Sequence, residues 1–290
     1  MKRLFIAFAA ALVLAGCAAS APETIEASIP GPVRTIPAQI QKPALRPGEK
    51  APFVVICHGL TGNLGEEHLT RLSDSLLVRG IGSVRFNFNG HGDDETNFVH
   101  HTISREVSEA LAVFDYVSEL EWVDESRMGI AGHSQGGVVA GITAGELGSE
   151  RLACLALLAP AACIHTNIVS GTMFGLVIPS DELEALSKAA AEDPAAPQGV
   201  PFWGGRTLGW DYIKDAMNLD MHALAARFTG PSIIVQGTAD DPGLIADSKA
   251  YCDYMSDVQY VALKGLSHCY PEDYALAALT AAEFLAAHLQ

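Results

Sequence analysis

The sequence predicts an α/β fold, with a mostly parallel central sheet, helices on both faces and a small inserted cap. Three observations predict it. A short, wholly apolar run rich in Val and Ile, Phe53–Cys57, is typical of a buried parallel strand. Strand-like and helix-like segments alternate after it along most of the chain. One long, proline-containing segment, residues 161–228, interrupts this alternation.

The first seventeen residues are typical of an export signal. Lys2 and Arg3 form a charged start, the apolar stretch 4–14 follows, and 14–17 read Leu-Ala-Gly-Cys. That ending resembles the bacterial lipobox, which implies that Cys17 is lipidated and becomes the first mature residue. The alternative is an ordinary cleaved signal with an incidental Cys. The apolar stretch is shorter than the roughly 20 residues that span a bilayer. We therefore expect an exported protein, anchored to a bacterial membrane by lipid, with a tether at 18–22.

The predicted domain at 23–290 starts with two alternating, proline-containing stretches, 24–29 and 33–40, which we interpret as edge strands. After the buried strand the patterns predict, in order, helix 66–79, strand 81–86, helix 103–120, strand 127–131, helix 135–147 and strand 152–158. The later elements are strand 232–235, helix 244–255, strand 258–263 and helix 273–289. The segment 161–228 between the two groups is interpreted as a cap over a site.

Composition and charge exclude several classes of protein. The 290 residues are 49% hydrophobic and 18% charged, unlike disordered, collagen-like or coiled-coil chains. Lys and Arg number 18 against 34 Asp and Glu, a net charge of -16, so we expect no nucleic-acid partner. The five cysteines after Cys17 are too dispersed for a disulfide framework or a zinc site, although a Cys252–Cys269 bridge stays open. Cys57 and Cys154 are expected to be buried in apolar runs.

Residues 132–136, Gly-His-Ser-Gln-Gly, fit the pattern G-x-S-x-G between a predicted strand and a predicted helix. In this context the glycines permit a sharp turn that exposes the Ser134 hydroxyl. The helix that follows directs its N-terminal amides toward the same place. Ser134 is therefore the candidate nucleophile.

A serine hydroxyl needs a base and a carboxylate that orients the base. His268 follows a strand through a short loop and is preferred as base to His222, in the cap, and His288, near the chain end. Asp240 follows the strand 232–235 and is preferred as the acid to Asp241, which precedes Pro242 and reads as a turn residue.

The loop after the first buried strand, residues 58–62, reads His-Gly-Leu-Thr-Gly. We expect the backbone N–H groups of Leu60 and Gln135 to form an oxyanion hole, a pair of donors for the negative oxygen of a reacting carbonyl. His58 and His91 are interpreted as structural. His100 and His101 are adjacent and do not face one another, so we expect no metal and no cofactor.

Four segments together resemble the bacterial cinnamoyl and feruloyl esterases of the α/β-hydrolase superfamily: 58–63, 83–92 (Ser-Val-Arg-Phe-Asn-Phe-Asn-Gly-His-Gly), 132–140 and 158–162. The resemblance runs from about Phe53 to the C-terminus. The order Ser, Asp, His along the chain is also that of this superfamily. The resemblance implies an α/β-hydrolase fold, a Ser134, Asp240 and His268 triad, and a cap that binds the aromatic acid of a hydroxycinnamate ester.

The sequence departs from that family in the cap. Where family members carry an Asp and a Gln that contact the phenolic ring, this chain has Asn167 and Phe174, while a Tyr is retained as Tyr212. We expect a serine carboxylester hydrolase for hydroxycinnamate esters, acting on a small-molecule ester through an acyl-enzyme. The alternatives are an esterase for short aliphatic or other acyl esters, and a non-catalytic lipoprotein binding module on the same fold.

Overall fold

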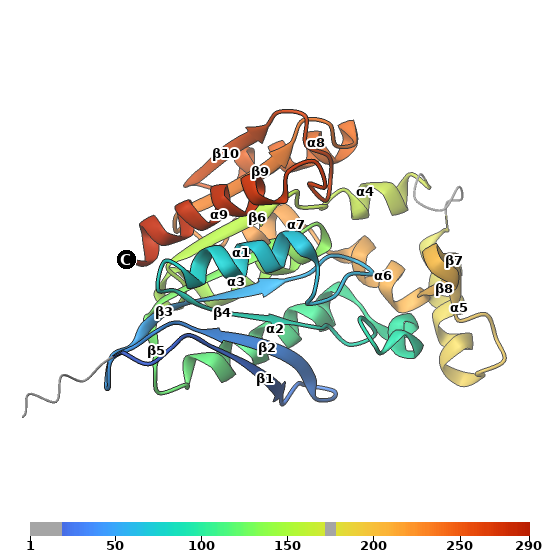
Figure 1. The fold of residues 1–290 in the computed structure, drawn as a ribbon. Helices are drawn as coiled ribbons and strands as arrows, with labels where there is room; N and C mark the ends of the chain where they lie inside the picture. The colour runs from blue at the N-terminus through green and yellow to red at the C-terminus, as the bar shows by residue number, and fades with distance from the viewer. Residues whose placement is uncertain (1–18, 172–177) are drawn as a thin grey trace, which may run out of the picture.

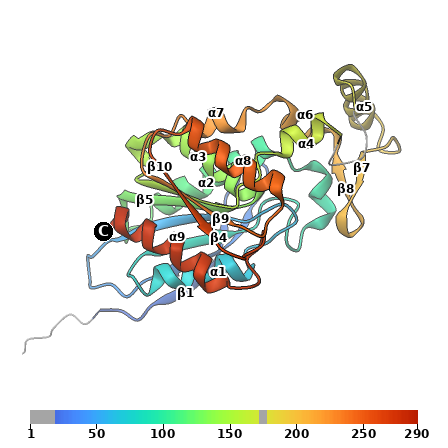
Figure 2. The same cartoon turned by 90° about the horizontal axis from the view of Figure 1, so that it is seen from above.

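The computed structural model describes residues 19–171 and 178–290. Within them, the largest sheet has eight strands in the order β1-β2-β4-β3-β5-β6-β9-β10. The six strands from β4 to β10 in this order run parallel to one another. Helices cover both faces of this sheet (Figures 1 and 2). The predicted α/β fold, with a mostly parallel central sheet, is confirmed.

The central strands are the most apolar ones, and every residue of β3 is buried. The strands are β1 (Glu23–Ile29), β2 (Ile36–Lys42), β3 (Ala51–Cys57), β4 (Gly82–Phe86), β5 (Val123–His133), β6 (Cys154–Leu158), β9 (Ser232–Gly237) and β10 (Val258–Leu263). A strand with helices on both sides must bury both sets of side chains, which explains its continuous apolar sequence.

Strands β1 and β2 form an antiparallel pair at one side of the sheet, with Ile25 opposite Ile40. Of these two strands, only β1 is an edge strand. β2 lies between β1 and β4, so the expectation of two edge strands was wrong for β2. Pro37 is tolerated there because it is the second residue of the strand, where a missing N–H removes little of the ladder.

Two helices, α1 (Glu67–Leu77) and α9 (Tyr274–Leu289), pack together on one face of the sheet. Helices α2 (Ile103–Ser118), α3 (Gln135–Arg151) and α8 (Pro242–Tyr254) cover the other face. Capping side chains on Thr102, Asp241 and Asp273 accept backbone N–H bonds and set where α2, α8 and α9 begin. Among the described helices, none has the length and apolar character to cross a bilayer.

The segment predicted as a cap contains more regular structure than its sequence indicated. It holds α4 (Ile164–Val169), α5 (Ser180–Glu192), a hairpin of β7 (Gly199–Phe202) and β8 (Arg206–Gly209), α6 (Trp210–Asn218) and α7 (Met221–Ala225), with a short 3-10 turn at Trp203–Gly205. Helix α5 and the hairpin project at one end of the molecule (Figure 1). Strand β8 packs on the 3-10 turn Glu95–His100, and α7 packs on α3, within the main body.

Candidate active site

Ser134 lies at the turn from β5 into α3. Its φ is 56° and its ψ is -123°, a conformation that non-glycine residues rarely adopt. The flanking glycines are required by close backbone approach. A Cβ atom at Gly132 would lie 2.0 Å from the Gly136 carbonyl oxygen, and one at Gly136 would lie 2.2 Å from the His58 carbonyl oxygen. The turn therefore holds the serine in a strained, raised position, as G-x-S-x-G predicts.

The structure brings Ser134, His268 and Asp240 into one hydrogen-bonded chain. His268 Nε2 lies 2.9 Å from Ser134 Oγ, and His268 Nδ1 lies 2.9 Å from Asp240 Oδ2. Because a carboxylate only accepts, Nδ1 carries the ring proton and Nε2 accepts from the serine hydroxyl. This is the arrangement in which an imidazole can remove the proton of a serine as it attacks.

The Asp240 side chain is only 2% exposed, yet it is held ionised. Burial favours the neutral acid, but hydrogen bonds from His268, from Gln236 Nε2 and from the Asp241 N–H outweigh it and lower the pKa of Asp240. The Gln236 side chain is itself held by Ser248, which donates to its Oε1 at 2.5 Å. The carboxylate that orients His268 is thus fixed from several sides.

The alternative acid and base residues, Asp241, His222 and His288, make other contacts. The Asp241 carboxylate caps α8 by accepting from the Gly243 N–H. His222 Nε2 lies 3.5 Å from Asp247 Oδ1, and the exposed His288 on α9 donates from Nδ1 to the Phe284 carbonyl.

The loop after β3 forms a tight turn beside the serine. The Gly62 N–H donates to the Gly59 carbonyl, and Thr61 has a φ of 64°, as the third position of a type II turn requires. A Cβ at Gly59 would lie 3.1 Å from the Ser134 Cβ, so the turn passes directly over the nucleophile. Leu60 is the second residue of this turn and Gln135 is the first residue of α3, where a helix leaves its N–H groups without partners inside the helix.

His58 braces this turn. Its Nδ1–H donates to the Gly59 carbonyl at 2.8 Å, and its Nε2 accepts from the Phe88 N–H at 3.1 Å. Burial and the nearby ring of His91 lower the pKa of His58 to about 3, so the ring is neutral and can make both bonds. The geometry agrees with a structural histidine.

His133, the variable residue before Ser134, supports the loop of His268. Its Nε2–H donates to the His268 carbonyl at 2.9 Å, and its ring lies 4.2 Å from that of His68. Near them, burial raises the pKa of Glu66 to about 7, although contacts with the Gly59 backbone and His268 oppose the shift. Neither His68 nor Glu66 was recognised in the sequence.

A buried polar network lies behind Gln135. The Tyr212 hydroxyl donates to Gln135 Oε1 at 2.6 Å, and Gln135 Nε2 donates to Glu106 Oε2 at 2.7 Å. All three side chains are buried, and burial raises the pKa of Glu106 well above its usual range. Glu106 was not predicted from the sequence. The sequence feature that could have indicated its burial is the position of this acidic residue on the apolar face of α2, next to the buried Val107.

Two of the three residues expected to bind the substrate, Asn167 and Tyr212, lie within the described residues. Tyr212 is fully buried, with its hydroxyl bonded to Gln135. Asn167 is half-buried on α4, and its Nδ2 lies 3.5 Å from Cys163 Sγ. Phe174 lies outside the described residues, as does Cys17.

Cys57, Cys154 and Cys163 are buried free thiols, and Cys252 and Cys269 are exposed free thiols. The bridge between the last two that the sequence left open is not formed in this structure.

Comparisons with known proteins place the chain in a family and find similar solved structures. The family model Hydrolase_4, described as "Serine aminopeptidase, S33", matches residues 48–273. The structure of Est1E from Butyrivibrio proteoclasticus with ferulic acid bound is 27% identical, with a TM-score of 0.76, over 88% of this chain and 95% of that one. A second Est1E structure is 26% identical, with a TM-score of 0.74, over 91% and 98%.

A dienelactone hydrolase from Anabaena variabilis shares the fold, at 14% identity and a TM-score of 0.62, over 93% of this chain and 100% of that one. No curated protein matches the sequence.

Proposed function

We propose that this chain, which belongs to the serine aminopeptidase, S33 family (Hydrolase_4), is a serine carboxylester hydrolase. The observation that carries the proposal is the hydrogen-bonded chain from Ser134 through His268 to Asp240 on a strained turn. Membership of a serine hydrolase family supports hydrolysis, and the site supplies a nucleophile, a base and an oriented carboxylate for it.

In the proposed reaction, Ser134 Oγ attacks the ester carbonyl while His268 Nε2 takes the hydroxyl proton. The negative oxygen that forms accepts the N–H groups of Leu60 and Gln135. His268 then gives its proton to the departing alcohol, which leaves an acyl group on Ser134. Water, deprotonated by His268, attacks this acyl-enzyme and releases the acid. Asp240 keeps the proton on Nδ1 throughout, so Nε2 stays available.

We further propose that the preferred esters are hydroxycinnamates. Two facts support this: the sequence resembles cinnamoyl and feruloyl esterases, and the 27% identical Est1E was solved with ferulic acid bound. Because the Tyr212 hydroxyl is engaged by Gln135, we expect Asn167, rather than Tyr212, to supply the polar contact to the phenolic ring.

The test compares kcat/KM for methyl ferulate and methyl butyrate, using the chain from Ala18 onward, with Ser134→Ala as the inactive control. We expect ferulate to be preferred, and Asn167→Ala to reduce that preference while sparing butyrate turnover. Turnover of butyrate without ferulate would retain the esterase and discard the substrate class. Failure of a fluorophosphonate probe to label Ser134 in the folded protein would indicate a non-catalytic binding module.

We also propose that Cys17 carries the lipid of an exported, membrane-anchored enzyme. The position of the tether supports an orientation in which the active site faces away from the bilayer. The Ser20 N–H donates to the Leu45 carbonyl, beside the loop that leads into β3, at the N-terminal ends of the parallel strands. Ser134, Asp240 and His268 follow the C-terminal ends. We expect Cys17→Ser to move the enzyme out of the membrane fraction with its activity intact; a variant that stays membrane-bound would contradict the anchor.

A further inference from the structure

Three unpaired polar atoms meet in the buried core behind the candidate active site. They are His91 Nε2, His101 Nε2 and Glu106 Oε1, on side chains that belong to residues no more than 3% exposed. All three lie within 4.8 Å of one another, with His91 Nε2 and Glu106 Oε1 3.9 Å apart. None of the three has a hydrogen-bond partner among the described residues. Buried polar atoms are rarely left unpaired, so this convergence requires an explanation.

The backbone determines which ring nitrogens are free. His91 Nδ1 lies 3.2 Å from the Asn89 carbonyl oxygen, and His101 Nδ1 bonds to the Phe98 carbonyl oxygen. A carbonyl oxygen can only accept, so each Nδ1 carries the ring proton and each Nε2 of a neutral ring presents a lone pair. Histidines that ligate metals are commonly oriented in this way, through the second ring nitrogen and a backbone carbonyl.

Two acidic side chains are buried beside the two histidines. The other oxygen of Glu106 accepts from Gln135 Nε2, and Glu109, one turn along α2, is a second buried acid. Glu109 accepts from the Asn89 backbone N–H and side chain. Buried carboxylates are stabilised by pairing or by coordination of a metal.

We propose that His91, His101 and Glu106 bind one divalent transition-metal ion, with Zn²⁺ the best fit. Two imidazole nitrogens and a carboxylate oxygen are a common zinc ligand set. Three atoms within 4.8 Å of one another can lie about 2.8 Å from a common centre. Zinc bonds of about 2.0–2.2 Å therefore require each ligand atom to move by less than about 1 Å.

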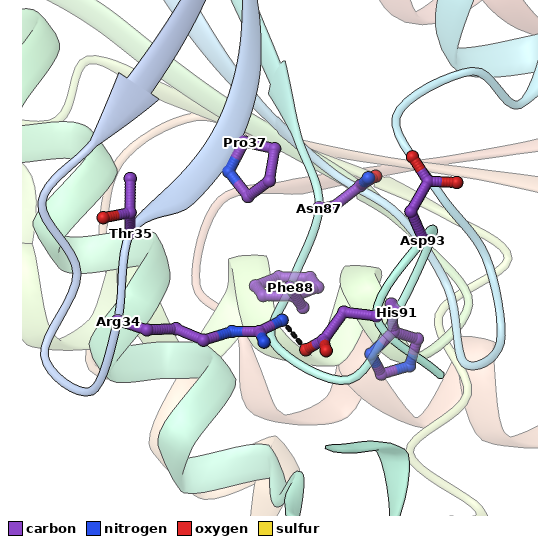
Figure 3. A pocket seen from close by; sticks show the side chains of 8 residues that line it. Arg34, Thr35, Pro37, Asn87, Phe88, His91 and Asp93 are labelled. Carbon is purple, nitrogen blue, oxygen red and sulfur yellow. Dashed lines mark ion pairs between the residues drawn. The ribbon is translucent and has the colours of Figure 1, made fainter. Parts of the chain in front are cut away.

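One pocket borders this cluster at His91. The pocket has a volume of about 380 Å³, and His91 is one of its eight lining residues (Figure 3). Asp93 and Asp94 also line it, and the ion pair between Asp94 and Arg34 crosses it. Its lining includes no residue of the Ser134, His268 and Asp240 chain, so this pocket is distinct from the proposed ester site.

A second histidine and glutamate cluster, of Glu66, His68 and His133, serves as an internal comparison. There the tautomer of His133 is set by the His268 carbonyl, but no hydrogen bond recorded in residues 19–171 and 178–290 sets that of His68. His68 can therefore place a proton on Nε2, toward Glu66 Oε2 at 3.9 Å. Glu66 is also 24% exposed, so its carboxylate can be hydrated. Its polar atoms Glu66 Oε2, His68 Nε2 and His133 Nδ1 are also unpaired among the described residues, but no backbone carbonyl fixes His68 for coordination, so this cluster is the weaker metal site and the internal control.

A metal at the first site would act as a positioning element for the reaction. It would fix Glu106, which holds the side chain of Gln135, whose N–H we propose as an oxyanion donor. It would also join the loop that carries His91 to helix α2, which carries Glu106. The binding proposal itself does not depend on the proposed esterase function.

The test measures metal content in the full chain, purified without a histidine tag, stripped with a chelator and then dialysed against Zn²⁺. We expect about one zinc per chain by elemental analysis, and less than about a tenth of that in His101→Ala and Glu106→Gln, since each loses a ligand. Glu106→Gln keeps the shape of the side chain and can still accept from Gln135, so it is expected to fold. Co²⁺ loaded into the wild type should give the intense visible bands of a four- or five-coordinate site.

The matched control is His68→Gln, which removes an equally buried histidine from the second cluster. It should retain one zinc and the Co²⁺ spectrum. Loss of zinc in His68→Gln with retention in Glu106→Gln would place the metal elsewhere and overturn the proposal. A stripped wild type that takes up neither Zn²⁺ nor Co²⁺ would also overturn it. These readouts do not use ester turnover, so an inactive enzyme leaves the metal test intact.

Discussion

Replacing Gly136 with alanine adds a Cβ atom where the start of α3 passes close to the end of β3. These two segments lead to the proposed oxyanion donors, Gln135 and Leu60. The new Cβ would lie 2.2 Å from the His58 carbonyl oxygen and 2.5 Å from that of Cys57. Both oxygens belong to the backbone at the end of β3, two to three residues before Leu60. A rotamer change cannot relieve the overlap, so the start of α3 and the end of β3 must separate.

The size of the separation follows from the contact. Real Cβ atoms essentially never approach closer than 3.0 Å, so the gap at His58 must open by about 0.8 Å. A misplacement of about 1 Å at a reacting centre lowers rates by about 100-fold. Overpacking of this kind destabilises a fold by about 1–3 kcal/mol. We therefore expect kcat/KM to fall by about 100-fold in a protein that still folds.

The assay is kcat/KM with p-nitrophenyl acetate, read beside thermal unfolding. Gly141→Ala is the control on the same helix, because its Cβ would meet only the Ala225 Cβ at 3.1 Å and a Leu157 methyl at 3.9 Å. It also gains about 1 kcal/mol of helix propensity, so we expect activity close to wild type. A folded Gly136→Ala enzyme with the kcat/KM of the control would refute the argument.

Three further predictions follow from the site. Asp240→Asn should lower kcat by about 10⁴-fold, because the amide favours the wrong tautomer of His268, whereas Asp241→Asn should have little effect; equal losses would contradict the assignment. The pKa of Glu66 is about 7 when folded, above its ordinary value, so the folded state binds more protons between the two values. The free energy of unfolding should fall as pH rises from about 5 to 8, and Glu66→Gln should flatten that fall in thermal unfolding; an unchanged slope would contradict it. In the chain from Ala18, a thiol reagent should modify two cysteines when native and five when unfolded, and more than two in the native state would contradict the burial of Cys57, Cys154 and Cys163.

Much of the fold was predictable because its signals are local. The buried strand at 53–57 and the turn at 132–136 depend on a few neighbouring residues. Strand β5 runs over Val123–His133 and is longer than the predicted 127–131. Its first part, which includes Asp124 and Glu125, is polar and does not show the apolar pattern by which a buried strand is predicted. The interior position of β2 depends on which strand pairs with β4, and no local pattern reports that pairing.

The buried network behind Gln135 was not predictable in the same way. By its sequence alone, Glu106 is typical of an acidic residue on a helix surface. In the structure it bonds to Gln135, which also bonds to the Tyr212 hydroxyl of the cap, 77 residues further along the chain. The same holds for His91, which comes near Glu106 only because its loop folds against α2. The sequence pattern does not indicate which polar side-chain atoms come together in the fold.

The sequence by itself determined the class of fold and the candidate nucleophile, because a strand, a glycine-flanked serine and a helix are set by residues in immediate succession. Only the tertiary structure decided which acid and which histidine reach Ser134. His268 lies 134 residues from Ser134 and 28 from Asp240 in sequence, and the three meet because parallel strands end at one edge of the sheet. Contacts over such separations depend on the order of strands in the sheet, which is a property of the whole fold.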